Sequence, residues 1–370
     1  MARIHLAVIN DLVSDNRVHK VCKTLESMGF WVHLTGRKLP KSPILNKRTY
    51  STHRMRLLFK KGPLFYAEYN FWLFFHLMIN KYDVIVANDL DTLPASYLAA
   101  KLKKKPLIYD SHEYFTEVPE LIDRPKIKRF WERIERKIVP KVDSAYTVCH
   151  SIANTYSQKY NVPFEVVRNL PEQYTVDEIP EAYRISGNGE KIIIYQGALN
   201  VGRGLEQVIT AMQFIDAHLY IAGDGDIREQ LKALTIDLNL KHKVSFLGRI
   251  ALEKLRFYTA QADLGISAEE DLGLNYRYAL PNKIFDYIQS GVPVLCSPLP
   301  EMENIINQYK IGQCIKSKEP EKLAEQISDM LFNDTQRAEY LNNLSVAAKE
   351  LNWNQEKKVL ESIFQVFLYH

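Results

Sequence analysis

A glycine-rich loop in the second half of the chain carries an arginine, a combination suited to binding phosphate. The loop follows a predicted strand at residues 192–196 and reads Gly197-Ala-Leu-Asn-Val-Gly-Arg-Gly204. Glycine lets the backbone approach a phosphate closely, and the helix expected next would turn its first N–H groups toward an anion. Arg203 adds a positive charge and a planar fork of donors. Gly197, Arg203 and Gly204 are therefore predicted to hold a diphosphate, although a glycine-rich turn alone is a weak signal.

A second segment, residues 278–294, predicts a helix with a lysine and an aspartate on one face. Pro281 suits its first turn and Gly291 its end. Lys283 and Asp286 are three residues apart and so share a side of the helix. The lysine could neutralise phosphate while the carboxylate grips two ribose hydroxyls. The alternative is a surface ion pair between the two.

Other expected strand ends in this half could contact a nucleotide. Gly223 follows a strand at 218–222, and Arg249 and Ile250 follow one at 244–247, where backbone could hold the edge of a base. A plain turn is the alternative. The loop at Gly223 partly matches a dinucleotide fingerprint but lacks its third glycine, so NAD binding is not favoured.

In the first half, ionisable residues gather directly after a strand expected at 106–109. Asp110, His112 and Glu113 follow it within four positions. His112 could donate a hydrogen bond to a sugar hydroxyl or a leaving oxygen. Asp110 and Glu113 are predicted to face the acceptor, the molecule that would receive a transferred group. The alternative for a lone histidine is a structural residue satisfied by its neighbours.

The loop at 10–17 is a further segment predicted to contact the acceptor. We predict that Asp11 and Arg17 contribute there, with Arg17 meeting an anion. Ser14 or Asp15 can cap the helix expected at 16–28, and simple capping is the alternative role of this loop.

Metal and cofactor signals are weak. Residues 89–91 read Asp-Leu-Asp, which resembles the DxD of metal-dependent sugar transferases, but Asp91 is expected to cap the helix at 93–103. The four cysteines are scattered, with no CxxC, and are interpreted as reduced core residues of a cytosolic protein. We predict no metal site and no cofactor.

Strands and helices that alternate along both halves must position these residues, a pattern typical of α/β domains with parallel sheets. Strands are expected at 3–9, 30–34, 84–87, 106–109, 144–148 and 164–168, and helices at 16–28, 93–103, 126–139 and 151–159. After a break at 184–190, strands are expected at 192–196, 218–222, 244–247, 264–267 and 292–297, and helices at 204–213, 227–238, 252–260 and 282–290.

The pattern predicts two doubly wound, Rossmann-like domains, residues 1–172 and 173–350. A terminal helix in 351–370 is expected to pack back on the first, through Trp353, Leu360, Ile363, Phe364 and Phe367. Ligands of parallel sheets bind beyond the carboxyl ends of the strands, so all the loops above lie at the ligand edge. The cleft between the domains is the expected site.

Charge is divided unevenly along the 370 residues. Residues 1–172 hold 28 Lys and Arg against 17 Asp and Glu, whereas residues 173–370 hold 20 against 27. A basic half favours anionic partners such as a lipid surface, an anionic acceptor or nucleic acid. No nucleic-acid recognition motif supports the last. No signal peptide and no apolar run long enough to span a membrane is recognised, so a cytoplasmic protein is expected.

The sequence resembles the retaining family 4 glycosyltransferases of GT-B fold over nearly its whole length. The matching segments are 14–18, 109–113, 168–171, 203–204, 246–248 and, most specifically, 281–294, together with the helix at Trp353. Two positions depart from the common pattern: Ala198 replaces an arginine, and Tyr278 replaces the first of two glutamates eight residues apart. Asp286 fills the second glutamate position.

The resemblance implies transfer of a sugar from a nucleotide-diphosphate donor with retention of configuration. Arg203 and Lys283 would stabilise the leaving diphosphate without an essential metal, and His112 would orient the donor sugar. Segments 54–61 and 126–137 mix basic and large apolar residues and could rest on an anionic membrane, or be solvated helices. The acceptor is expected to be a glycan, polysaccharide or lipid-linked sugar. A nucleotide-sugar epimerase and a non-catalytic two-domain binding protein remain alternatives.

Overall fold

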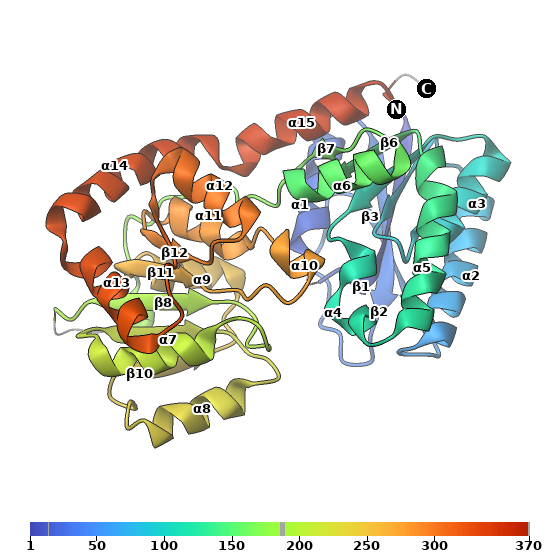
Figure 1. The fold of residues 1–370 in the computed structure, drawn as a ribbon. Coiled ribbons are helices and arrows are strands. Elements are labelled where there is room, and N and C mark those ends of the chain that lie inside the picture. The colour runs from blue at the N-terminus through green and yellow to red at the C-terminus, as the bar shows by residue number, and fades with distance from the viewer. Residues whose placement is uncertain (14, 186–188, 369–370) are drawn as a thin grey trace. The chain divides into compact units, whose positions relative to one another are not determined.

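The computed structural model describes residues 1–13, 15–185 and 189–368 of the chain, drawn in Figure 1. It divides into unit 1, Met1–Asn169 with Glu356–His370, and unit 2, Leu170–Gln355. The domain boundaries expected from the sequence were 172/173 and 350/351. Ser14, considered as a helix cap, and residues 186–188 of the expected break lie outside the described residues.

Unit 1 is built on a parallel sheet in the order β3-β2-β1-β4-β5-β6-β7. Its strands are β1 (Arg3–Asp11), β2 (Trp31–Lys38), β3 (Ser51–Arg56), β4 (Val84–Asn88), β5 (Leu107–Ser111), β6 (Ser144–Thr147) and β7 (Glu165–Val166). Its helices are α1 (Asn16–Ser27), α2 (Pro63–Ile79), α3 (Leu93–Lys103), α4 (Pro119–Ile122), α5 (Pro125–Ile138) and α6 (His150–Tyr160). The strand order reverses between β1 and β4, which marks the point where such sheets bind ligands.

The elements of unit 1 follow from local sequence where the pattern is strong. β4 and β5 are buried along their whole length, as continuous strands covered on both faces require. The Asp15 carboxylate caps α1 by accepting the Val18 N–H at 3.0 Å. Gly29, with φ of +100°, follows the end of that helix. The capping predicted for Asp15 is thus confirmed.

The last helix, α15 (Trp353–Gln365), buries its apolar positions, but Trp353, which was expected to pack on the first domain, belongs to unit 2. Its candidate packing residues, and Phe367 just beyond it, are all buried: Trp353, Leu360, Ile363, Phe364 and Phe367. The Phe364 ring centroid lies 6.4 Å from that of Phe30 and 6.1 Å from that of Tyr146. The residues of α15 from Glu356 onward therefore belong to the core of unit 1.

β3, α2 and the short helix α4 of unit 1 were not predicted. α2 is apolar on nearly every side, so its sequence shows no helical period. Residues 54–61, considered as a solvated helix, instead begin inside the edge strand β3. That interpretation was wrong because the backbone of β3 pairs in parallel with β2, where Arg54 is the register partner of Gly36, and the Arg54 side chain forms an ion pair with Asp11.

Unit 2 repeats the architecture with a parallel sheet in the order β10-β9-β8-β11-β12-β13. The strands are β8 (Ile192–Gln196), β9 (His218–Ala222), β10 (Val244–Gly248), β11 (Leu264–Ser267), β12 (Val294–Cys296) and β13 (Gly312–Cys314). The helices are α7 (Leu205–Ala211), α8 (Arg228–Asp237), α9 (Leu252–Thr259), α10 (Leu274–Arg277), α11 (Asn282–Gln289), α12 (Pro300–Tyr309), α13 (Pro320–Phe332) and α14 (Asp334–Glu350). The two doubly wound, Rossmann-like domains predicted from the sequence are confirmed.

Candidate functional site

In unit 2 the strand order reverses between β8 and β11, and the loops around this point touch backbone to backbone. A Cβ on Gly223 would lie 1.8 Å from the Gly197 carbonyl oxygen, and one on Gly204 would lie 2.1 Å from the Ala268 carbonyl oxygen. Gly223 and Gly204 both have positive φ, 158° and 66°. Glycine is required at both positions because no side chain fits.

Two glycine amides of these loops are already used inside the fold. The Gly197 N–H donates to the Ala222 carbonyl at 3.0 Å, and the Gly223 N–H donates to the Gly248 carbonyl at 2.8 Å. Both donors are used to hold the loops together. These two amides are therefore not available to a bound anion.

Two of the predicted cations meet at one buried carboxylate that the sequence analysis missed. Glu269 is fully buried and accepts hydrogen bonds from Lys283 Nζ at 2.8 Å and from Ser267 Oγ at 2.7 Å. Arg203 Nη1 lies 3.6 Å from the same carboxylate. Lys283 Nζ also lies 4.0 Å from the centre of the Tyr195 ring. The fold thus joins the loop after β8, the loop after β11 and helix α11.

The charges of this group leave it net positive. Burial alone would raise the pKa of Glu269, but the charge and hydrogen bond of Lys283 outweigh it and lower that pKa, so the carboxylate is ionised. Two cations against one carboxylate leave one positive charge. Arg203 Nε is buried and has no hydrogen-bond partner among the described residues, so a donor points at an unfilled acceptor position.

A cavity of about 270 Å³ opens beside this group at the carboxyl ends of β8, β9 and β10. It is lined by Gly197, Ala198, Ala222, Gly223, Asp224, Arg249, Ile250 and Leu255. This volume is just below the roughly 300–1,000 Å³ of ligand pockets, so it suits one moiety of a nucleotide sugar. Four residues predicted at the nucleotide site lie in its wall: Gly197, Gly223, Arg249 and Ile250.

Lys283 and Asp286 do not form the ion pair that was the alternative for α11. Lys283 turns to Glu269, whereas the Asp286 carboxylate accepts the Gln196 side-chain amide at 2.8 Å. The Gln196 carbonyl oxygen in turn accepts the Thr259 hydroxyl at 2.7 Å. Asp286 is therefore oriented by a polar chain at the end of β8.

In unit 1, His112 lies between two carboxylates at the end of β5. Its Nε2 is 3.0 Å from Asp110 Oδ2, and its Nδ1 is 3.3 Å from Asp89 Oδ2. Burial would lower the pKa of His112, but the two carboxylates outweigh it and raise that pKa to about 9. His112 is an imidazolium at neutral pH, and it can donate to a sugar only by exchanging one carboxylate partner.

Arg17 and Asp110 are too deeply buried for the acceptor contacts predicted for them. Arg17 Nη2 donates to Asp110 Oδ1 at 2.9 Å, and Arg17 Nη1 donates to the Val167 carbonyl at 2.9 Å. Despite the cost of burial, Arg17 and His112 lower the pKa of Asp110 to about 2. Asp110, fixed by Arg17, therefore holds the His112 ring in place, and neither Arg17 nor Asp110 faces a ligand.

The two other residues predicted to contact the acceptor, Glu113 and Asp11, lie in different surroundings. A cavity of about 120 Å³ contains Glu113 and His112 in its wall, together with Asp89 and Asp91. Asp11 instead bonds both of its oxygens to Arg54, at 2.7 and 2.9 Å. The fold therefore gathers Glu113 and His112 and engages Asp11 elsewhere.

The capping role expected of Asp91 was wrong. Thr92 precedes the first residue of α3, and its side chain makes no capping hydrogen bond. Asp91 is buried, and burial, with Asp89 and Glu113 nearby, raises its pKa well above the usual range. Burial also raises the pKa of Asp89, and both carboxyl groups lie in the wall of the same cavity.

Glu269 was missed, and Asp89 was considered only as part of a weak metal motif, although both had a signal in the sequence. Asp89 follows β4 directly, and Glu269 follows β11 by one residue, at the points where the strand order reverses in each sheet. Ligand sites form there in doubly wound sheets. Reading every acidic residue after each strand at these points would have found both.

Comparison with known proteins finds glycosyltransferases along nearly the whole chain. The family model described as glycosyl transferases group 1 matches residues 177–350, and the family model described as glycosyltransferase family 4 matches residues 15–171. Both halves of the chain thus match glycosyltransferase families. An uncharacterized glycosyltransferase of Methanocaldococcus jannaschii is 26% identical over 318 residues, covering 78% of this chain and 77% of that protein.

Solved structures show the same fold over the whole chain. Sucrose-phosphate synthase of Thermosynechococcus elongatus has a TM-score of 0.80 at 17% identity and covers 100% of both chains. Anabaena HepE, in complex with UDP and glucose, has a TM-score of 0.73 at 14% identity over 99% of this chain and 100% of its own. This glycosyltransferase therefore has the GT-B arrangement of two Rossmann-like domains predicted from its sequence.

Proposed function

We propose that this glycosyltransferase moves a hexose from a nucleoside-diphosphate sugar to a glycan, polysaccharide or lipid-linked acceptor, with retention of anomeric configuration. The observation that carries the donor proposal is the net positive group of Arg203, Lys283 and Glu269 beside the 270 Å³ cavity. The cavity would take the base, Asp286 would grip the ribose, and Arg203 would meet the diphosphate. UDP, which Anabaena HepE binds, is the first base to test.

Charge development explains how these residues would assist transfer. When the bond to the sugar breaks, negative charge grows on the leaving diphosphate, and fixed cations nearby stabilise it. Arg203, partly exposed and with an Nε that has no hydrogen-bond partner in the part of the chain that the structure describes, is placed to bind that charge. Lys283 acts mainly through Glu269, which fixes both cations. We propose that this arrangement makes an essential metal at the donor site unnecessary.

His112 is proposed to position the donor sugar as a charged hydrogen-bond donor. With a pKa of about 9 it already carries its proton at neutral pH, so it does not serve as a general base there. Its longer contact, 3.3 Å to Asp89, is the one that a sugar hydroxyl would replace. Glu113, in the same wall, is the proposed acceptor-side contact.

A lipid-linked acceptor is supported by the outer surface of unit 1. Phe71, Trp72, Phe75 and Ile79 of α2 are between 43% and 79% exposed, and 71, 75 and 79 recur at helical spacing. α3 contacts both α2 and α5, and the three helices lie side by side in Figure 1.

The segments on this side of unit 1 also carry charge suited to a membrane. Residues 54–61 and α5 add exposed Leu58, Phe59 and Phe130 among basic residues. No helix among the described residues is long and apolar enough to cross a bilayer. We propose that this surface rests on an anionic membrane, where such a mixture binds.

Donor binding by isothermal titration tests the function. Wild-type protein should bind one nucleoside diphosphate selectively, and Arg203→Ala should weaken that binding about tenfold or more, because a charge-assisted hydrogen bond contributes roughly 1.5–3 kcal/mol. Arg184→Ala, at an exposed arginine of the same unit, is the control. Unchanged affinity in Arg203→Ala would overturn the site assignment.

Product analysis tests the reaction itself. Incubation with the selected nucleotide sugar and candidate acceptors should yield a glycosylated acceptor, whose anomeric configuration NMR would show to match the donor's. An isomerised free sugar would instead indicate an epimerase, and binding without turnover a non-catalytic protein. Transfer that persists in EDTA would support the absence of an essential metal.

A further inference from the structure

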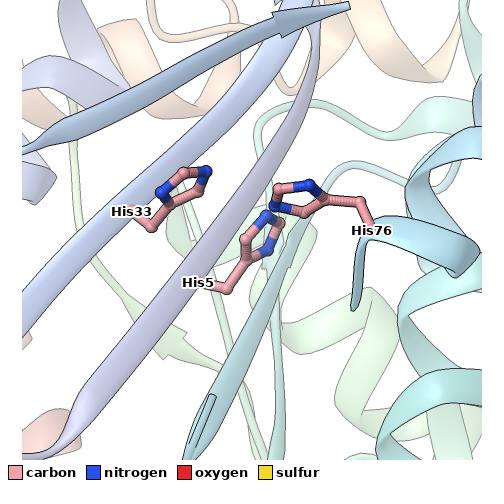
Figure 2. Close-up of side chains that lie close together, drawn as sticks. All are labelled: His5, His33 and His76. Carbon is pink, nitrogen blue, oxygen red and sulfur yellow. The ribbon is translucent and has the colours of Figure 1, made fainter. Parts of the chain in front are cut away.

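Three histidines far apart in the sequence meet in unit 1, away from the ligand edge of the sheet. His5 on β1 and His33 on β2 are register partners, and His76 comes from α2 on the same side (Figure 2). One ring nitrogen from each lies within 4.8 Å of the other two. His5 is fully buried, and His33 is 9% exposed. No other metal-compatible group of three was found among the described residues.

Each ring has a hydroxyl within hydrogen-bond distance of one of its nitrogens. The pairs are Thr35 Oγ1 at 2.8 Å from His5 Nε2, Ser51 Oγ at 3.0 Å from His33 Nδ1, and the Tyr82 hydroxyl at 3.0 Å from His76 Nε2. Metal-binding histidines show this division of labour: one nitrogen bonds a fixed partner and the other bonds the metal.

The remaining nitrogens of two rings lack hydrogen-bond partners among the described residues, whereas His76 Nδ1 lies 3.5 Å from Asn80 Nδ2. His5 Nδ1 and His33 Nε2 are buried with no hydrogen-bond partner among the described residues. Leaving a buried polar atom unsatisfied is unfavourable, so such atoms in native proteins usually have a water, an ion or another ligand. Two of them in one group of three imidazoles indicate a bound electrophile.

We propose that His5, His33 and His76 bind one Zn²⁺ ion, with water in the fourth position. Imidazole nitrogen is a preferred zinc ligand at about 2.0–2.1 Å, which sets the ligand atoms of a tetrahedral site about 3.3 Å apart. The rings must therefore close by up to about 1.5 Å from their present spacing. His76 is only half-buried, at one end of α2, and can make that adjustment by side-chain rotation.

The surroundings of the three rings favour their neutral form. Burial, strengthened by the proximity of the other imidazoles, lowers the pKa of His33 and of His76 to about 4, and that of His5 also lies well below its usual value. The rings are therefore neutral at pH 7, the state that binds a metal.

The proposed ion is structural rather than catalytic. His5 precedes Val8, the first β1 residue in the wall of the His112 cavity, by three positions, or about 10 Å along a strand. A zinc ion held by β1, β2 and α2 would clamp the helix to the sheet. This inference does not depend on the proposed transfer reaction.

Zinc titration of the tag-free, chelator-stripped full chain tests the site. Calorimetry should show one Zn²⁺ per chain, zinc should raise the Tm, and Co²⁺ should give the intense visible absorption of a four-coordinate site. His33→Gln and His76→Gln should each weaken zinc binding by more than about tenfold and abolish the rise in Tm. His242→Gln, at an exposed histidine of unit 2, should behave as wild type.

Zinc binding by the wild type and by the two histidine variants can support or overturn the proposed site. His33 is buried and His76 is half-buried, and because glutamine keeps a polar side chain of similar size at each position, the variants should fold, which circular dichroism would verify. Failure of wild-type protein to bind one equivalent of zinc at micromolar concentrations would overturn the proposal. Zinc binding by folded His33→Gln with wild-type affinity would overturn it equally.

Discussion

Replacing Lys283 with methionine would show how far the donor-site carboxylate depends on its partner. Lys283 is 8% exposed and Glu269 is fully buried, 2.8 Å from its Nζ. Removing one partner of a buried ion pair costs about 3–5 kcal/mol, because a charge is left uncompensated. Ser267 at 2.7 Å and Arg203 at 3.6 Å would remain. We therefore expect the lower end, a loss of about 3 kcal/mol in the free energy of unfolding.

A second substitution separates charge from packing. In Lys283→Met/Glu269→Gln no charge is stranded, and neutral replacement of a buried pair is often close to neutral in stability. The double variant should therefore recover most of the loss seen in Lys283→Met. Lys322→Met, at a lysine that is 61% exposed and pairs with Glu319 on the surface, should change stability by less than about 0.5 kcal/mol.

Urea denaturation at pH 7, followed by circular dichroism, measures all three variants. The pH dependence gives an independent check. The folded-state pKa of Glu269 is lowered in wild type, so its contribution is present above the unfolded pKa and is lost as pH falls. The deficit of Lys283→Met should accordingly shrink toward pH 4. A Lys283→Met protein as stable as wild type, or a double variant less stable than the single one, would refute the reasoning.

Three further predictions concern separate parts of the chain. Gly223→Ala should abolish nucleotide binding and lower the Tm, because its Cβ would lie 1.8 Å from the Gly197 carbonyl oxygen; normal binding by titration would contradict this. The folded-state pKa of His112 is raised to about 9, so its contribution to stability is full below about 6.5 and is lost as pH rises through 9; the gap in Tm between wild type and a His112→Gln variant should narrow over that range, and a constant gap would argue against the charged form. Phe71→Ser should weaken binding to anionic vesicles about tenfold, since burying such a side chain contributes roughly 1.5 kcal/mol or more; Leu341→Ser on α14, also at an exposed position, is the control, and equal losses in a sedimentation assay would count against a specific surface.

The alternation of strands and helices made the fold predictable, because it depends on local sequence. Buried strands such as β4 and β8 are continuous apolar runs, and α1 has both a cap and a terminating glycine. β3 and α2 escaped because neither has a clear period: β3 is an edge strand rich in basic residues, and α2 is apolar nearly all round. The periodicity of apolar residues in the local sequence indicates where a helix or strand lies. This signal is weaker where the element is exposed or apolar on all sides.

Side-chain partners were harder to predict because they are chosen across the fold. Local spacing placed Lys283 and Asp286 on one helix face, but Lys283 pairs with Glu269, fourteen residues earlier, and Asp286 with Gln196, ninety residues earlier. The same reason explains Arg17, which spacing left free for an anion and which the sheet buries against Asp110.

The histidines of unit 1 are the extreme case of this dependence on the fold. Their positions, 5, 33 and 76, have no metal-ligand spacing in the sequence, and they meet only because β1 and β2 pair in register under α2. Residues at strand ends can be assigned to the ligand edge from sequence order alone, since doubly wound sheets bind ligands there. A site built across the middle of a sheet needs the register and the covering helix first, so it becomes visible only in the folded chain.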